Sequence, residues 1–264
     1  YFIILLMLVQ TCKIIQTSQS APSVPNFINQ LINPLLNCIL TVMLAFTFLL
    51  FPLMLAGFCL SYRNSKVVPV IFTGFMTSVI LCFIKMFFVY SHRVVPYSYL
   101  SNAVYLILRQ SFFPVTVVYS LFFLISKDDI EFKRDSFVPL MFSFYSAFLP
   151  YDIIATAEDG IYDFFGLFIK PALFAMMIIY ISFFLKVFIK KYQSTKTIKD
   201  PLVVLSAAAI LLNLCIPSLI EAMHIIDVSS FVVVVCSCVY IVVAVVYIFI
   251  KSFIKSFSIC KTVK

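Results

Sequence analysis

The sequence predicts an all-α fold, a polytopic transmembrane helical bundle with seven spans, and three observations support this. Of 264 residues, 63% are hydrophobic and 11% charged, with a mean hydropathy of +1.12, whereas soluble domains are about half apolar and about a quarter charged. The apolar residues form seven stretches of roughly 20 residues or more, which suits a helix that crosses about 30 Å of hydrocarbon. These stretches are continuous and lack the alternation of membrane β-strands. A soluble globular protein is therefore excluded.

Charges and prolines bound the expected spans, and short links join them. The bundle covers 38–250, with spans at 38–60, 67–90, 101–126, 136–157, 164–189, 201–226 and 229–250. A polar extracytoplasmic linker, 21–37, precedes the bundle, and a basic cytoplasmic tail, 251–264, follows it. Residues 1–20 contain a further apolar segment, for which two alternatives stand: a cleavable signal core and an eighth, tilted helix. The choice changes the number of helices but not the later topology.

The distribution of basic residues predicts the orientation. Fourteen of the 19 Lys and Arg residues follow the first, third, fifth and seventh spans, whereas Arg93 alone lies in the opposite loops. The positive-inside rule makes the richer side cytoplasmic, so we expect a multi-pass protein of the plasma or inner membrane with a cytoplasmic C-terminus. The basic rim is expected to attract anionic lipid headgroups. The net charge of +8 therefore requires no nucleic-acid partner.

Ionisable residues in the predicted spans share the outer half of the bilayer. Each costs roughly 2.5–3.5 kcal/mol in hydrocarbon on insertion scales, which makes each a candidate functional residue. If they face inward, five helices build one charged vestibule that opens to the extracytoplasmic side. These residues are Lys85, Arg109, Asp152, Lys170, Glu221 and His224.

The sixth span adds an amide to this candidate site. Asn213, Pro217, Glu221 and His224 recur at helical spacing and therefore share one face. Pro217 has no N–H, so the carbonyl of Asn213 lacks its usual intrahelical donor and is free to meet water or a ligand. We expect Asn213 to join the ligand-binding residues.

Two neighbouring spans carry related polar positions. Asn102, Tyr105 and Arg109 share a face of span 101–126, and Tyr145 precedes Asp152 by seven residues in the next span. Two interpretations of these stripes stand side by side. The polar groups contact a ligand, or the acidic and basic residues pair only to make their burial tolerable.

The sequence lacks the motifs of common catalytic and metal sites. No G-x-S-x-G, Walker or dinucleotide-binding fingerprint occurs, and only four glycines are present. The eight cysteines form no C-x-x-C, and there are two histidines. We therefore predict no catalytic residue, no metal site and no cofactor.

The first functional hypothesis is binding, with transport, of an anionic small solute or lipid headgroup through the vestibule. The three basic residues attract the anion, while the two acidic residues and the histidine orient it or relay protons. An alternative is a non-catalytic subunit or scaffold that partner membrane subunits hold by its Phe-rich and Val-rich faces. The scarcity of glycine favours that alternative, because moving bundles usually pack through small residues. A seven-helix sensor and a membrane-embedded hydrolase or transferase that uses Asp152, Glu221 and His224 are further alternatives.

Overall fold

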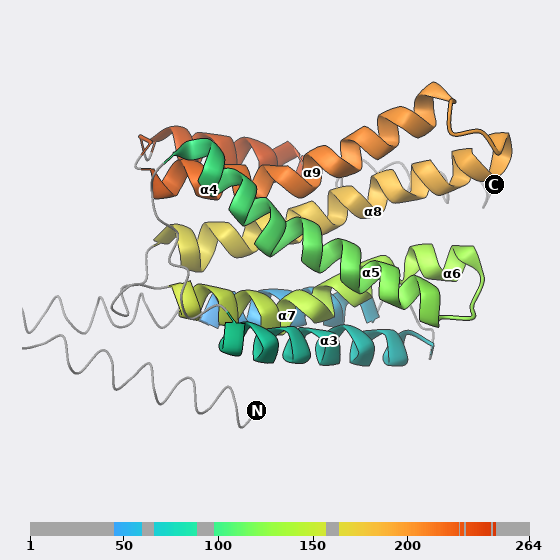
Figure 1. Cartoon of the computed structure of the whole chain (residues 1–264), viewed down its shortest axis with the longest axis horizontal. Coiled ribbons are helices and arrows are strands. Elements are labelled where there is room, and N and C mark those ends of the chain that lie inside the picture. The colour runs from blue at the N-terminus through green and yellow to red at the C-terminus, as the bar shows by residue number, and fades with distance from the viewer. Residues whose placement is uncertain are drawn as a thin grey trace, which may run out of the picture.

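The computed structural model describes residues 45–59, 66–88, 98–156, 164–226, 228–229, 231–243 and 245–246, and the regular elements in these ranges are all helices (Figure 1). The labelled elements are α3 (Val67–Phe88), α4 (Tyr99–Leu106), η1 (Ile107–Phe112), α5 (Phe113–Ile125), α6 (Ile130–Asp135), α7 (Phe137–Thr156), η3 (Phe165–Ile169), α8 (Lys170–Thr195) and α9 (Pro201–Ile225). Elements η1 and η3 are π-helical turns that continue into α5 and α8. Two further apolar helices cover Ala45–Cys59 and Phe231–Val243.

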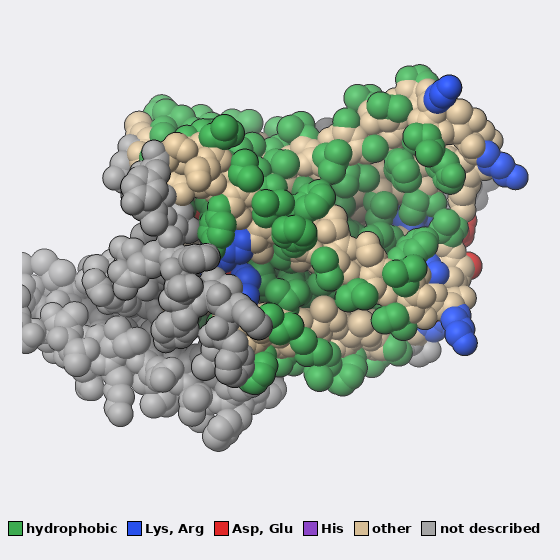
Figure 2. Space-filling model, in the orientation of Figure 1, with side chains coloured by type: hydrophobic (Ala, Val, Ile, Leu, Met, Phe, Trp, Pro, Cys, Tyr) green, Lys and Arg blue, Asp and Glu red, His purple; other side chains and the backbone are tan. Residues whose placement is uncertain are grey.

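Five helical stretches in the described ranges are long and apolar enough to cross a membrane. They cover Val67–Lys85, Tyr99–Ile125, Ile130–Ile154, Phe165–Thr195 and Pro201–Ile225. The first and last predicted spans contain shorter apolar helices, so the all-helical prediction is confirmed while the count of seven spans stays a prediction. The segments 1–20, 21–37 and 251–264 lie outside the described residues. Figure 2 shows a surface of mostly hydrophobic side chains with Lys and Arg toward its two ends, which is compatible with a membrane-embedded protein.

Side chains that satisfy free backbone N–H groups mark where several helices begin. Ser98 accepts from the N–H of Ser101 before α4, and Asp129 caps α6 in the same way. Asp200 caps α9 and stands before Pro201, whose missing N–H costs nothing in the first turn. The caps of α4 and α9 explain why these helices begin within two residues of the predicted spans, whereas α6 begins at Ile130, six residues before the predicted span 136–157.

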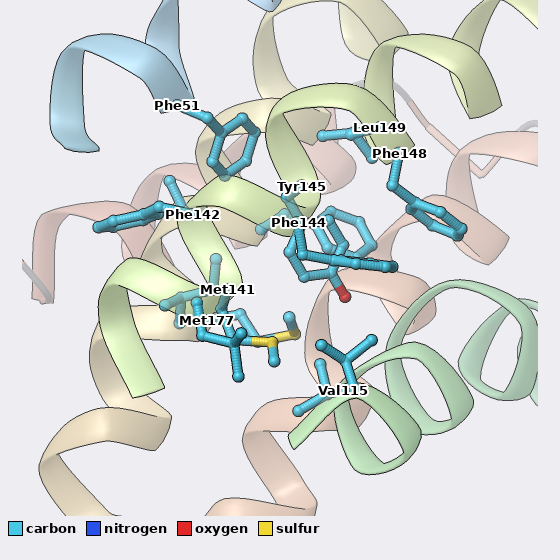
Figure 3. Close-up of a cluster of buried hydrophobic side chains, with 14 of the residues drawn as sticks. Phe51, Val115, Met141, Phe142, Phe144, Tyr145, Phe148, Leu149 and Met177 are labelled. Atoms are coloured by element: carbon cyan, nitrogen blue, oxygen red, sulfur yellow. The ribbon is translucent and has the colours of Figure 1, made fainter. Parts of the chain in front are cut away.

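Helix α7 lies at the centre of the bundle. In the apolar stretch Ile130–Ile154, which contains α7, 72% of the most apolar segment is buried inside the protein. The corresponding share for Val67–Lys85 of α3 is 22%. Figure 3 shows the aromatic side chains of α7, among them Phe144, Tyr145 and Phe148, packed toward the neighbouring helices. Tyr145 and Phe144 are fully buried. A central, well-packed α7 therefore fixes the position of the residues at its C-terminal end.

Successive long helices run in opposite directions, so one end of the bundle gathers the last turns of α3, α7 and α9 with the first turns of α4 and α8 (Figure 1). Helix α3 packs on α7 and α8 packs on α9. This arrangement brings together residues that are more than 130 positions apart in the sequence, from Lys85 to Glu221.

Candidate functional site

Asp152, near the C-terminal end of α7, is the centre of a buried group of polar side chains. Its carboxylate is fully buried and accepts hydrogen bonds from four side chains. Oδ1 accepts from Lys85 Nζ at 3.0 Å and from Arg109 Nη2 at 2.8 Å. Oδ2 accepts from Gln110 Nε2 at 2.9 Å and from Lys170 Nζ at 3.2 Å. The four donors come from α3, η1 and α8, so Asp152 joins three other elements.

Glu221 of α9 also belongs to this group, because two of the four donors to Asp152 donate to it as well. Its Oε1 accepts from Lys170 Nζ at 2.7 Å and from Gln110 Nε2 at 3.3 Å. Lys170 and Gln110 thus each bridge two carboxylates. We call the full set the charge cluster, and its members are Lys85, Arg109, Gln110, Asp152, Lys170 and Glu221.

The π-helical turn η1 explains how two consecutive residues, Arg109 and Gln110, both reach the cluster. The wider turn ends just before Pro114, which has no N–H for the carbonyl of Gln110, four residues earlier. The hydroxyl of Tyr145 donates to that carbonyl at 2.8 Å. Helix α7 therefore satisfies the backbone group that the proline leaves free.

The same arrangement occurs where η3 leads into α8. Pro171 leaves the carbonyl of Leu167 without an intrahelical donor, and the Thr47 hydroxyl donates to it. Lys170 is the first residue after this π-helical turn. Two prolines, each preceded by a π-helical turn and each compensated by a hydroxyl from another helix, thus position two of the three cations. Turns of this kind are frequent at functional sites.

The cluster is buried and carries a net positive charge. Lys170 is 3% exposed, and Lys85 and Glu221 are each 8% exposed. Among the described residues, three cations meet two carboxylates, which leaves a formal excess of one positive charge. Unpaired charge is costly inside a protein, so this excess favours the approach of an anion.

Three buried polar atoms of the cluster have no hydrogen-bond partner in the structure. They are Arg109 Nε, Gln110 Oε1 and Glu221 Oε2. Buried polar groups in proteins nearly always have a partner, which is either another protein group or an ordered water. The cluster therefore has donors and acceptors left for water or a ligand, even though its charged groups already pair with one another.

Asn213 and His224 share a helix with Glu221 but contact other groups. Asn213 Oδ1 accepts from the Tyr240 hydroxyl at 2.9 Å, and the His224 ring stacks on Phe165 with centroids 4.4 Å apart. Asn213 precedes Glu221 by eight residues, which separates the two positions by about 12 Å along the helix at 1.5 Å per residue. The structure therefore gathers five of the seven sequence-predicted site residues, and their ligand-binding role stays a prediction.

Gln110 is a member of the cluster that sequence analysis missed. The signal was a second polar residue beside Arg109 within an apolar span, but neighbouring residues on a regular α-helix point in different directions. Tyr105, which the helical spacing did place beside Arg109, accepts a hydrogen bond from Arg109 Nη1 at 3.3 Å.

Charged pairs at the other end of the bundle are more exposed than those of the cluster. Lys66 Nζ lies 3.3 Å from Asp128 Oδ1, with the two side chains 65% and 35% exposed. A hydrogen bond from Ser126 and the nearby Lys66 hold the pKa of Asp128 below its usual value. Such surface pairs contribute little to stability. The buried charge cluster is therefore the stronger candidate for function.

Within the ranges that the structure describes, no group of three or more His, Cys, Asp or Glu side chains could hold a metal ion. Comparisons of the chain with protein-family models, with curated proteins and with solved structures find no match. The functional argument therefore rests on the chemistry of the charge cluster.

Proposed function

We propose that this protein binds an anionic small solute or lipid headgroup at the charge cluster and carries it through the membrane. The observation that supports the proposal most directly is that Lys85, Arg109 and Lys170, from three different helical elements, converge on the single buried carboxylate of Asp152. Even with Glu221 included, three cations meet two carboxylates among the residues that the structure describes. An incoming anion would balance the charge.

A purely structural role accounts less well for these features. A group of buried ion pairs is rarely the most stable way to fill a core, since well-packed apolar residues are often equally good or better. A structural network would also be expected to balance its charges and to satisfy its polar atoms. The excess positive charge and the unpartnered Arg109 Nε, Gln110 Oε1 and Glu221 Oε2 fit a site that awaits a ligand or water.

The proposed direction of access follows from the basic residues at the opposite end. The loops and helix ends that carry Lys66, Lys127, Lys133, Lys190 and Lys191 lie away from the cluster, and the positive-inside rule assigns that end to the cytoplasm. The cluster then lies toward the extracytoplasmic side. The cytoplasmic lysines would contact anionic headgroups, at about 1 kcal/mol for each basic residue close to the surface.

The experiment uses the full chain in phosphatidylcholine nanodiscs and proteoliposomes. Equilibrium binding and uptake of radiolabelled acetate and phosphate are compared for wild type, Arg109→Glu and Arg109→Gln. Lys186→Glu is the matched control, because Lys186 pairs with Asp135 at the other end of the bundle, 46% exposed.

We expect both Arg109 variants to lose binding while the Lys186 variant retains it. Circular dichroism and gel filtration identify variants that fail to fold, and Arg109→Gln provides the milder change if charge reversal is not tolerated. Unchanged binding and uptake in a folded Arg109 variant would overturn the proposal.

A further inference from the structure

Counted over the residues that the structure describes, the excess positive charge of the cluster lies on one side of Asp152. Lys85 Nζ and Arg109 Nη2 share a single acceptor, Asp152 Oδ1, at 3.0 and 2.8 Å. On the other side, Lys170 has two carboxylate oxygens, Asp152 Oδ2 and Glu221 Oε1, within 3.2 Å. Lys170 is thus surrounded by negative charge, whereas Lys85 and Arg109 divide one carboxylate between them.

Lys85 and Arg109 are also the more accessible cations. Their side chains are 9% and 10% exposed, against 3% for Lys170. Figure 2 shows Lys and Arg side chains that reach the surface at this end of the bundle, between α4 and the end of α3. The side chain of Asp152 is fully buried and that of Glu221 is 11% exposed, so an anion that arrives from this end reaches Lys85 and Arg109 before it reaches Asp152.

Aromatic rings accompany both cations. Lys85 Nζ lies 4.0 Å from the centroid of the Phe148 ring, and the Arg109 guanidinium lies 5.7 Å from that of Tyr105. Cation–π contacts of this kind hold a cation without neutralising it. The rings therefore orient the two side chains and leave their charge for a ligand.

We infer that the ligand presents a monoanionic group, a carboxylate or a singly charged phosphate ester, and that Lys85 and Arg109 share one of its oxygens as they share Asp152 Oδ1. This inference rests on the proposed function and specifies the charge class of the ligand. A second negative charge would exceed the single excess positive charge and would lie close to Asp152 and Glu221 in a medium of low dielectric, where like charges repel strongly. The cluster therefore selects monoanions over dianions.

Glu221→Gln tests this inference because it changes the formal charge of the cluster and keeps its hydrogen bonds. The amide oxygen of the variant still accepts from Lys170 and Gln110, so the contacts of Oε1 are kept, while the formal excess rises from one positive charge to two. We expect wild type to bind acetate about tenfold or more tightly than sulfate, because the repulsion of a second negative charge by the nearby Asp152 and Glu221 exceeds the energy of a tenfold change in affinity. Glu221→Gln should shift this preference toward sulfate by a similar factor.

The experiment measures equilibrium binding of radiolabelled acetate and sulfate to the full chain in phosphatidylcholine nanodiscs at constant ionic strength. Lys85→Gln removes the excess charge and should weaken acetate binding about tenfold or more, whereas Lys186→Gln at the far end should match wild type. Wild type that prefers sulfate, or a Glu221→Gln variant with unchanged preference, would overturn the inference while anion binding stands. If wild type binds neither probe, the proposed function itself fails.

A second series of measurements, in nanodiscs of different lipid composition, distinguishes a lipid headgroup from a dissolved monoanion as the ligand. Nanodiscs that contain phosphatidylglycerol present a singly charged phosphodiester in the bilayer. If the natural ligand is a headgroup, phosphatidylglycerol should compete with acetate in wild type but not in Lys85→Gln. If acetate binding is the same in both lipids, the ligand is a dissolved monoanion.

Discussion

Lys170 and Gln110 donate to the same two oxygens, Asp152 Oδ2 and Glu221 Oε1. An ammonium and an amide thus each bridge two buried carboxylates. Because Gln110 is neutral, it supplies hydrogen bonds without adding charge, and the formal excess of the cluster stays at one. This ring of two donors and two carboxylates explains how the proposed anion site could contain two acidic residues.

A double-mutant cycle on this ring should reveal strong coupling. Gln110→Leu and Lys170→Met each leave the shared oxygens with one donor fewer, and the double variant removes both. We expect a coupling energy of about 0.5–3 kcal/mol, the range for residues in one network. Thermal unfolding in detergent measures it. A control cycle of Gln110→Leu with Asp200→Ala, at the capped start of α9, should be additive within about 0.5 kcal/mol. If the effects of Gln110→Leu and Lys170→Met on stability are additive, the two residues do not act in one network.

Removal of the central carboxylate should be more damaging than any other charge change. Asp152→Ala leaves Lys85 and Arg109 buried without their common acceptor, and loss of one partner of a buried pair costs about 3–5 kcal/mol. The matched control is Asp128→Ala, whose exposed pair with Lys66 should matter little. Unfolding temperatures of the two variants in the same detergent check this. Equal shifts would argue against Asp152 as the centre of the cluster.

The common depth of the buried charges could be predicted from the sequence. Charged residues near the ends of alternating spans lie at one end of an antiparallel bundle, so the grouping of Lys85, Asp152 and Glu221 follows from span direction alone. Which residues touch does not follow, because contact depends on the rotation of each helix. Asn213 has the helical spacing of the site but meets Tyr240, while Gln110 reaches it through a π-helical turn.

Pro114, in the first turn of α5 directly after η1, gives the next prediction. Tyr145→Phe removes the hydroxyl that donates to the Gln110 carbonyl and should cost about 1–3 kcal/mol, because that buried group is left unsatisfied. In a Pro114→Ala background the backbone N–H at position 114 can donate instead, so the cost should fall. Unfolding of both single variants and the double variant measures the difference.

Tyr119→Phe is the matched control for the prediction that Pro114→Ala reduces the cost of Tyr145→Phe. The Tyr119 hydroxyl donates to the carbonyl of Lys133. The residue four positions after Lys133 is Phe137 and not a proline. Pro114→Ala should therefore leave the cost of Tyr119→Phe unchanged. If Pro114→Ala relieves both tyrosine variants equally, the compensation between Tyr145 and Pro114 is not specific.

Two glycines should respond to alanine with opposite signs. A Cβ on Gly74 of α3 would collide with the Leu140 carbonyl of α7, so Gly74→Ala should destabilise the bundle by about 1–3 kcal/mol. A Cβ on Gly57 meets nothing within 4 Å, so Gly57→Ala should stabilise by about 0.5–1 kcal/mol through helix propensity. Unfolding temperatures compare the two. Stabilisation by Gly74→Ala would mean that α3 and α7 pack less closely than the structure shows.

The proposed access route depends on sidedness, which reporter fusions test. The richer supply of Lys and Arg after alternate spans predicts that Lys264 is cytoplasmic and that Gly160, which lies between α7 and η3 in the sequence, is extracytoplasmic. A fluorescent protein that matures only in the cytoplasm should therefore report at position 264 and stay dark at position 160, and a phosphatase that needs export should do the reverse. Because Asp152 lies in the last turns of α7 and Gly160 follows that helix in the sequence, the opposite pattern would turn the charge cluster toward the cytoplasm. Anion binding could then survive, but entry from outside could not, since the ligand would first have to cross the bilayer.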